Sequence, residues 1–348
     1  MDFFQDPPRL GNQYDDDHLL RSWLRRALPR EVHDEIEPGL RHLGARAAGD
    51  LLALADAAER EPPRHVPYDP WGRRVDVIES SDAWRALDRA AAEEGIVATA
   101  YERAHGALSR VHQLARLYLY HPSSAIYSCP LAMTDGAART LERWGADDPY
   151  FRGVLERLTT RDPARFWTSG QWMTERTGGS DVSGTSTVAR RRGDGAYALT
   201  GAKWFTSATT SQVALTLARI VGGDDMNDDA DAPAGTAGLS LFLVELRDTQ
   251  GTLRGIRVDR LKDKLGTRAL PTAELTLIDA PARLVGGPGH GVRRSATVLN
   301  VTRLYKAVCA VANMRRALAL AADYATRRVA FGRPLAEHPL HVETLAGM

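Results

Sequence analysis

The run Met173-Thr174-Glu175-Arg176-Thr177-Gly178-Gly179-Ser180-Asp181 is the most informative stretch of this chain, and Ala202-Lys203-Trp204-Phe205-Thr206-Ser207 follows it after a hairpin-like link. Glycines let a backbone approach a ligand closely and expose its N–H groups to phosphate oxygens. An aromatic wall beside amides and hydroxyls satisfies both the apolar face and the polar edge of a flat ring. The two runs therefore predict a cradle for a flat, phosphate-bearing cofactor.

The composition is that of an ordinary globular protein. The chain has 348 residues, of which 43% are hydrophobic and 26% are charged, and this length allows two or three packed units. Its 45 basic and 44 acidic residues give a net charge of +1, so no overall field attracts nucleic acid or anionic lipid. We therefore do not expect DNA as a partner.

The cysteines and the distribution of apolar residues indicate where in the cell the protein is expected. Cys129 and Cys309 lie far apart, which argues against a disulfide framework or a zinc site and for a reducing environment. The first residues show no signal-peptide pattern, and no segment reaches the apolar length of a membrane span. We expect a cytoplasmic protein with no bound metal and no membrane association.

The first of three segments, residues 1–165, has the period of helices. Alanine, leucine and arginine dominate it, and apolar residues recur at spacings of three and four. One helix is expected to begin at Asp82 and another to run over residues 104–120. The second should stop at His121-Pro122, because the residue before a proline disfavours the helical conformation.

The second segment, residues 166–286, changes to the period of strands, which predicts a domain made of β-structure. The strand candidates are residues 196–200, 213–220, 239–246 and 273–278. Between two of them, residues 222–238 are rich in Asp, Asn, Ala and Gly. Because such a run cannot bury apolar surface, it predicts a mobile loop.

The third segment, residues 287–348, returns to the helical period. A long helix up to about Arg328 is predicted by the stripe Val301, Leu304, Val308, Val311 and Leu318. A stripe of this length needs an equally long partner, as in a helical bundle or a subunit interface. The sequence therefore predicts an α+β protein with a helical domain, a β domain and the first helices of an incomplete bundle.

Four motifs in this order resemble the acyl-CoA dehydrogenase family of flavoproteins. They are Met-Thr-Glu-x-x-x-Gly-Ser-Asp at 173–181, Lys-Trp-Phe-Thr-Ser at 203–207, Asp-Lys-Leu-Gly-Thr-Arg at 263–268, and Arg328-x-x-Phe331-Gly332. The runs 261–266, 314–317 and 331–340 are most similar to the alkylation-response branch of that family. The resemblance implies a helical N-terminal domain, a middle β-barrel or sandwich, and a C-terminal helical bundle.

The resemblance also implies FAD as the cofactor. It places Met173 and Thr174 against one side of the flavin ring and the run 203–207 on the other. Arg328 would reach the FAD diphosphate, often in a neighbouring subunit, where its fork can pair bidentately with phosphate. The predicted cofactor-binding residues are Met173, Thr174, Gly179, Ser180, Trp204, Phe205, Thr206, Ser207, Arg328 and Phe331.

For the substrate, the resemblance implies an acyl-CoA or another acyl thioester, bound with help from Ser180 and Arg303. Family members remove an α-proton with a carboxylate while the β-hydride passes to the flavin, which then delivers electrons to a separate acceptor. Here Thr302 occupies one position of that carboxylate. The other position would lie beyond Met348, and Glu175 matches a structural position. No catalytic base is identified.

Simpler interpretations remain for each motif. Residues 178–181 could form only a turn, Trp204 could be a core aromatic, and Arg328 a solvated helix end. Arg303 could belong to a surface ion pair. The resemblance implies a homo-oligomer, a dimer or tetramer. A hetero-oligomer in which another chain supplies the C-terminal bundle is the alternative.

Three functions follow from the resemblance. The first is oxidation of an acyl thioester to its α,β-unsaturated form. The second keeps the flavin but changes the reaction, as in flavin monooxygenases and nitroalkane oxidases. The third is a DNA-associated alkylation-response protein with vestigial catalysis.

Overall fold

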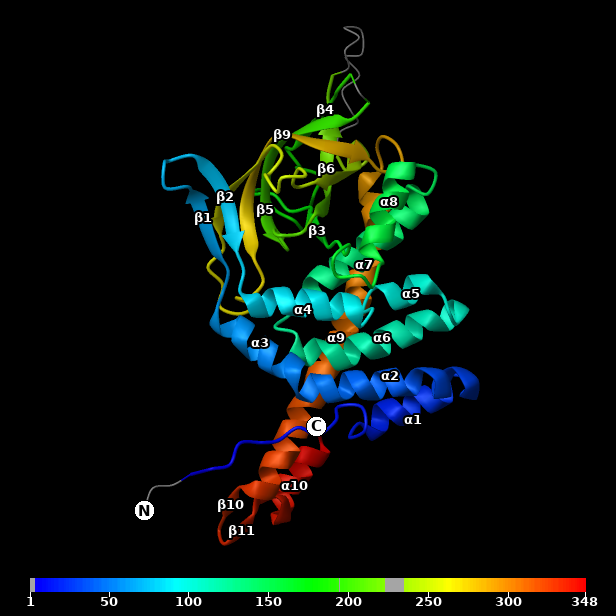
Figure 1. The fold of residues 1–348 in the computed structure, drawn as a ribbon, viewed down its shortest axis with the longest axis vertical. Coiled ribbons are helices and arrows are strands. Elements are labelled where there is room, and N and C mark those ends of the chain that lie inside the picture. Colours follow the sequence, from blue (N-terminus) through cyan, green and yellow to red (C-terminus); the bar gives the residue numbers. More distant parts are fainter. Residues whose placement is uncertain (1–3, 194, 223–234) are drawn as a thin grey trace.

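The computed structural model describes residues 4–193, 195–222 and 235–348, so the run for which a mobile loop was predicted lies mostly outside the described residues. Figure 1 shows a helical body in the middle, a β domain at one end, and a long helix that runs through the body and out of its other side. The predicted α+β class with a helical first part and a β middle part is confirmed.

The first 165 residues form mainly helices. Their bounds are α1 His18–Ala27, α2 Arg30–Ala48, α3 Asp50–Arg60, α4 Asp82–Glu93, α5 Ala98–Glu102, α6 Ser109–Tyr120, α7 Ser128–Trp144 and α8 Pro149–Leu158. The predicted start at Asp82 is confirmed, and the Ser81 hydroxyl caps this helix by accepting from the Trp84 N–H at 3.1 Å. Helix α6 ends at Tyr120, as the following His-Pro pair predicts.

A β-hairpin within this part was not predicted. Strands β1 Arg64–Tyr68 and β2 Arg74–Glu79 pair antiparallel and stand beside the β domain (Figure 1). Arg74 donates to the Val258 carbonyl at 2.7 Å, and Asp76 accepts from the Val258 N–H at 3.2 Å. Since these contacts come from a distant part of the chain, local periodicity does not reveal them.

The middle part is a β-barrel. Its strands are β3 Ser169–Trp172, β4 Val188–Arg191, β5 Tyr197–Ser207, β6 Val213–Ile220, β7 Leu239–Glu245, β8 Ile256–Leu261 and β9 Thr272–Leu284. The pairing order β6-β4-β5-β9-β7 closes on itself because β7 also pairs with β6. Buried residues such as Phe242, Leu275 and Leu277 form its core. The four predicted strands are confirmed, whereas β3, β4 and β8 were missed.

Helix α9, Gly291–Arg327, is the predicted long helix. At 1.5 Å per residue, its 37 residues span about 55 Å. The hairpin of β10 Val329–Ala330 and β11 Arg333–Pro334 and then α10 Pro339–Ala346 follow at the end of the molecule opposite the barrel (Figure 1). Among the described residues, no helix is long and apolar enough to cross a membrane.

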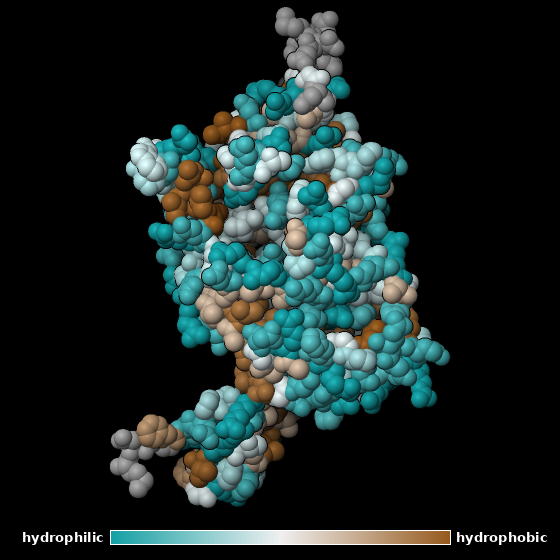
Figure 2. Space-filling view, viewed as in Figure 1, coloured by the Kyte–Doolittle hydropathy of each residue, from teal (hydrophilic) through white to brown (hydrophobic). Residues whose placement is uncertain are grey.

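The stripe that predicted α9 is only partly buried. Leu304 and Val311 are 43% and 46% exposed, and the residues that α9 buries include Val298, Tyr305 and Ala312. The helical body covers one side of the stripe, where Val301 and Val308 pack on the same core as Tyr305, and leaves the other side exposed. In Figure 2, hydrophobic atoms gather where α9 leaves the helical body.

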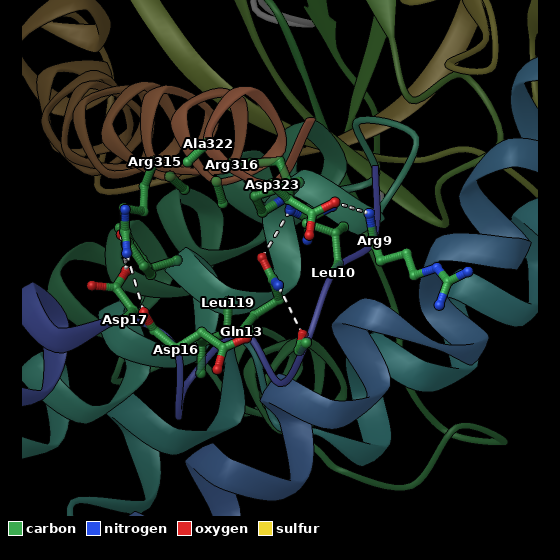
Figure 3. Close-up of a pocket in the computed structure, with 15 residues that line it drawn as sticks. Arg9, Leu10, Gln13, Asp16, Asp17, Leu119, Arg315, Arg316, Ala322 and Asp323 are labelled. Atoms are coloured by element: carbon green, nitrogen blue, oxygen red, sulfur yellow. Dashed lines mark hydrogen bonds and ion pairs between the residues drawn. The ribbon is translucent and has the colours of Figure 1, made fainter. Parts of the chain in front are cut away.

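The N-terminal segment packs on the second half of α9. Figure 3 shows Arg316 and Asp323 of the helix facing Arg9 and Gln13 of this segment. All four residues line a cavity of about 310 Å³. The Arg9 N–H donates to Asp323 at 2.7 Å, and Arg316 Nε donates to the Gln13 side chain at 2.9 Å. These contacts fix Arg9 and Gln13 against a helix far away in sequence.

Candidate functional site

Residues 173–181, the first run, and residues 202–207, the second run, meet at one edge of the barrel. Strand β3 leads directly into Met173 and Thr174, and the Thr174 carbonyl accepts a hydrogen bond from the Trp204 N–H at 2.9 Å. One step earlier, Trp172 Nε1 donates to the Ser207 carbonyl at 3.3 Å. The start of the first run is therefore fastened to the second run by a backbone hydrogen bond and, one step before the run, by the Trp172 side chain.

Glu175 is a buried structural carboxylate. One of its oxygens accepts from Lys203 Nζ at 2.8 Å and Thr187 Oγ1 at 2.5 Å, and the other from the Ser186 N–H and hydroxyl, both at 2.7 Å. Burial alone would raise the pKa of Glu175, but the Lys203 ammonium and these hydrogen bonds lower it to about 2. A carboxylate held this way is not available as a general base, which agrees with its predicted structural role.

The glycines of the first run form a tight turn. Glu175 and Gly178 exchange backbone hydrogen bonds of 3.2 and 3.1 Å, and Gly178 has a φ of +140°. A Cβ on Gly179 would lie 2.4 Å from Thr174 Oγ1, so only glycine lets the turn fold back onto Thr174. Ser180 is exposed on the far side of this turn.

The second run presents an aromatic surface. A bulge in β5 between Lys203 and Thr206 gives Phe205 a φ of +54° and leaves its ring 59% exposed. Positive φ is uncommon for a bulky residue and marks a site where other interactions outweigh backbone strain. Trp204 beside it is only partly buried, so the interpretation of this indole as a core residue does not hold.

Lys262 contacts this aromatic surface. Its Nζ lies 3.5 Å from the centroid of the Trp204 ring, 4.6 Å from that of Phe205, and 2.5 Å from Glu274 Oε1. A cation at this distance is attracted by the electron-rich face of an indole. The contact therefore holds Trp204 and Phe205 in place.

The two hydroxyls that end the second run differ. Thr206 is fully buried, and its hydroxyl donates to the Ala273 carbonyl at 2.7 Å. Ser207 is half-buried, and its Oγ lies 3.1 Å from Thr272 Oγ1. Lys264 Nζ donates to Thr272 Oγ1 at 3.0 Å, and burial lowers the pKa of this lysine. At this edge Ser207, rather than Thr206, has a hydroxyl that can face a ligand.

The remaining predicted residues lie on or beyond α9. Arg303 is exposed, and the hydroxyl of the neighbouring Thr302 donates to the Leu299 carbonyl at 3.0 Å. Arg328 is half-buried at the far end of the helix, and Phe331 is 97% exposed in the hairpin that follows. Within one chain, the length of α9 separates Arg328 and Phe331 from the barrel edge (Figure 1).

The site thus contains residues that the sequence reasoning missed. Lys262, Lys264 and Thr272 surround the second run: Lys262 precedes the 263–268 motif, Lys264 lies in it, and Thr272 begins β9. That motif signals the family, but the contacts depend on the pairing of β9 with both β5 and β8. No single segment carries that information.

Three family models match consecutive parts of the chain. They are the adaptive response protein AidB N-terminal domain at residues 6–162, the acyl-CoA dehydrogenase middle domain at 170–280, and the acyl-CoA dehydrogenase C-terminal domain at 289–348. These descriptions are those that the motifs and the helix-barrel-helix order predicted.

Individual proteins give the same result. Acyl-CoA dehydrogenase family member 11 of Caenorhabditis elegans is 44% identical over 99% of this chain, which spans 56% of that relative's length. A solved structure of Caenorhabditis elegans ACDH-11 in complex with C11-CoA matches with a TM-score of 0.95 and 44% identity, over 99% of this chain and 58% of the other. The apo form of Bd2924 matches with a TM-score of 0.94 and 57% identity, over 99% of this chain and 68% of the other.

Proposed function

This chain belongs to the acyl-CoA dehydrogenase family, in a branch similar to AidB, and from that membership we propose that it is an FAD-dependent oxidoreductase acting on an acyl thioester. The observation that carries the proposal is the meeting of the two runs at the barrel edge. Thr174 and Trp204 are joined there by a backbone hydrogen bond of 2.9 Å, beside the exposed ring of Phe205.

The barrel edge fits a flavin in its chemistry. Phe205 offers an exposed apolar face, while Ser207 and the exposed turn of residues 176–181 offer hydroxyl and backbone donors. When bound, FAD would accept a hydride equivalent from the substrate. We keep Met173, Thr174, Gly179 and Ser180 as residues that would hold it, together with Trp204, Phe205 and Ser207. The predicted Thr206 hydroxyl is instead buried and donates to the Ala273 carbonyl.

The proposed substrate class is an acyl-CoA. It is supported by the similarity to ACDH-11, whose solved complex contains C11-CoA. Bound FAD would supply the acceptor for the β-hydride, a separate electron acceptor would reoxidise it, and the α-proton would need a base. Glu175 is locked by Lys203, and Thr302 carries no carboxylate, so neither serves as the base.

Oligomerisation is part of the proposal. Arg328 and Phe331 lie at the opposite end of α9 from the barrel edge. We propose that they contact FAD bound by another subunit of a homo-oligomer, with a hetero-oligomer as the alternative. A cytoplasmic location is proposed from the two free thiols, Cys129 and Cys309.

The test measures FAD binding and then flavin reduction. We expect the purified chain to bind FAD. Bound flavin should lose its absorbance when a medium-chain or long-chain acyl-CoA is added without oxygen, once a partner or a longer chain supplies the base. Phe205→Ala should weaken FAD binding, whereas Trp71→Ala, which removes another aromatic ring that is 88% exposed, should leave it unchanged. Equal affinities for both variants would contradict the assigned surface. Flavin that no acyl-CoA reduces but that consumes oxygen would favour monooxygenase or oxidase chemistry.

A further inference from the structure

Lys264 reaches the end of β5 through a chain of hydrogen bonds. Its Nζ donates to the Leu270 carbonyl at 2.7 Å and to Thr272 Oγ1 at 3.0 Å, and Thr272 Oγ1 lies 3.1 Å from Ser207 Oγ. Lys264 and Thr272 also line a cavity of about 140 Å³. These hydrogen bonds therefore connect the ammonium group of Lys264 to the hydroxyl of Ser207 at the candidate site.

The chemistry of the three groups fixes the direction of these hydrogen bonds. An ammonium group only donates, so Thr272 Oγ1 is the acceptor at the Lys264 end. Thr272 is 5% exposed, and buried hydroxyl protons nearly always have an acceptor. Among the described residues, Ser207 Oγ is the acceptor within reach of this proton. We therefore assign Thr272 as the donor to Ser207, which leaves the proton of Ser207 to point away from Thr272.

We infer that Lys264 and Thr272 are positioning residues that hold Ser207 as a hydrogen-bond donor toward an acceptor on the polar edge of the bound cofactor ring. This inference rests on the proposed function and adds to it the polarity of one contact. Without the hydrogen bond from Lys264 to Thr272, the Ser207 hydroxyl could turn and donate to Thr272, which would leave the acceptor on the ligand without a partner.

The neighbouring Thr206 shows why the chain is specific. Its proton is already used by the Ala273 carbonyl at 2.7 Å, and its side chain is fully buried. The bulge between Lys203 and Thr206 sets which of the two hydroxyls faces out. The chain from Lys264 then sets which way the outward hydroxyl donates.

The experiment compares Thr272→Val with Thr272→Ser in the full chain, using the FAD dissociation constant and the flavin absorption spectrum. Loss of one hydrogen bond corresponds to about threefold to tenfold weaker binding. We expect this loss, with the same spectral shift, for Thr272→Val and for Ser207→Ala. Thr272→Ser keeps the hydroxyl and should stay within about twofold of the parent protein. The double variant of Thr272→Val and Ser207→Ala should bind no more weakly than Ser207→Ala alone.

The outcomes separate this inference from the proposed function. If the parent chain does not bind FAD, the proposed function is wrong. Two results with a parent that binds FAD would overturn the inference. In the first, Thr272→Val binds FAD as tightly as Thr272→Ser. In the second, the affinity lost in Thr272→Val adds fully to the affinity lost in Ser207→Ala, so the hydrogen bonds from Lys264 do not act through Ser207. Lys264→Met against Lys264→Gln is the second pair, used if Thr272→Val fails to fold. Gln keeps an N–H donor, so it should bind FAD more tightly than Met, and equal affinities would overturn the inference.

Discussion

Breaking the buried pair of Lys203 and Glu175 should destabilise the barrel strongly. Lys203 is fully buried and Glu175 is 4% exposed, with 2.8 Å between Nζ and Oε1. Removing one partner of such a pair leaves an uncompensated buried charge and costs about 3–5 kcal/mol. We therefore expect Lys203→Met to lower the free energy of unfolding by about 3–5 kcal/mol at neutral pH. Removing both charges together should cost less than the two single losses combined.

The pH dependence of stability gives an independent value for the contribution of Glu175. The pKa of Glu175 is lowered from 4.5 to about 2 in the folded protein. Each pKa unit corresponds to about 1.4 kcal/mol, so this carboxylate contributes about 3 kcal/mol of stability above the unfolded pKa. Because the folded pKa is the lower one, that contribution disappears as the pH falls from about 5 to about 2.

Urea unfolding of the parent, Lys203→Met, Glu175→Gln and the double variant measures both effects. Glu79→Gln is the matched control, because it removes one charge of the exposed Arg64–Glu79 pair, and it should change stability by less than about 1 kcal/mol. If Lys203→Met costs no more than Glu79→Gln, the buried pair does not support the site. If Glu175→Gln retains the full acid dependence of the parent, Glu175 is not its source.

Two further predictions concern packing around the site. Gly179→Ala should destabilise the turn by about 1–3 kcal/mol in a thermal unfolding assay, because a Cβ there would lie 2.4 Å from Thr174 Oγ1. The control is Gly184→Ala, where the new Cβ meets nothing within 4 Å, and it should be close to neutral in the same assay. A Gly179→Ala protein as stable as Gly184→Ala would contradict the close approach. Tyr305→Phe should lower the free energy of unfolding by about 1–3 kcal/mol, since the Tyr305 hydroxyl donates to buried Asp135 at 2.9 Å and accepts from Gln113 at 2.6 Å. An unchanged urea midpoint would show that this network does not hold α9.

The sequence predicts the order of the parts well, because helical and strand periods change at the right places. Helices α4 and α9 and four barrel strands follow from local patterns of this kind. Strand β8 and the hairpin of β1 and β2 do not, since their register depends on contacts such as that of Arg74 with Val258. Which part of the apolar stripe of α9 is buried also does not follow from the pattern, because tertiary packing sets the neighbours that cover it.

The candidate site divides in the same way. The runs 173–181 and 203–207 are recognisable from their residues, and the structure joins them through Thr174 and Trp204. That Lys262 lies over the Trp204 ring, or that Thr206 faces inward, depends on strand pairing and on the bulge in β5. Sequence motifs therefore indicate the candidate site, while the contacts of single side chains need the structure.

Hydrogen exchange of backbone amides with and without FAD tests the central claim most directly. The account predicts slower exchange on FAD addition in residues 173–181 and 203–207, with no change in the exposed β1–β2 turn around Trp71. Tight FAD binding without protection of these two runs, or with protection confined to other parts of the described chain, would contradict it.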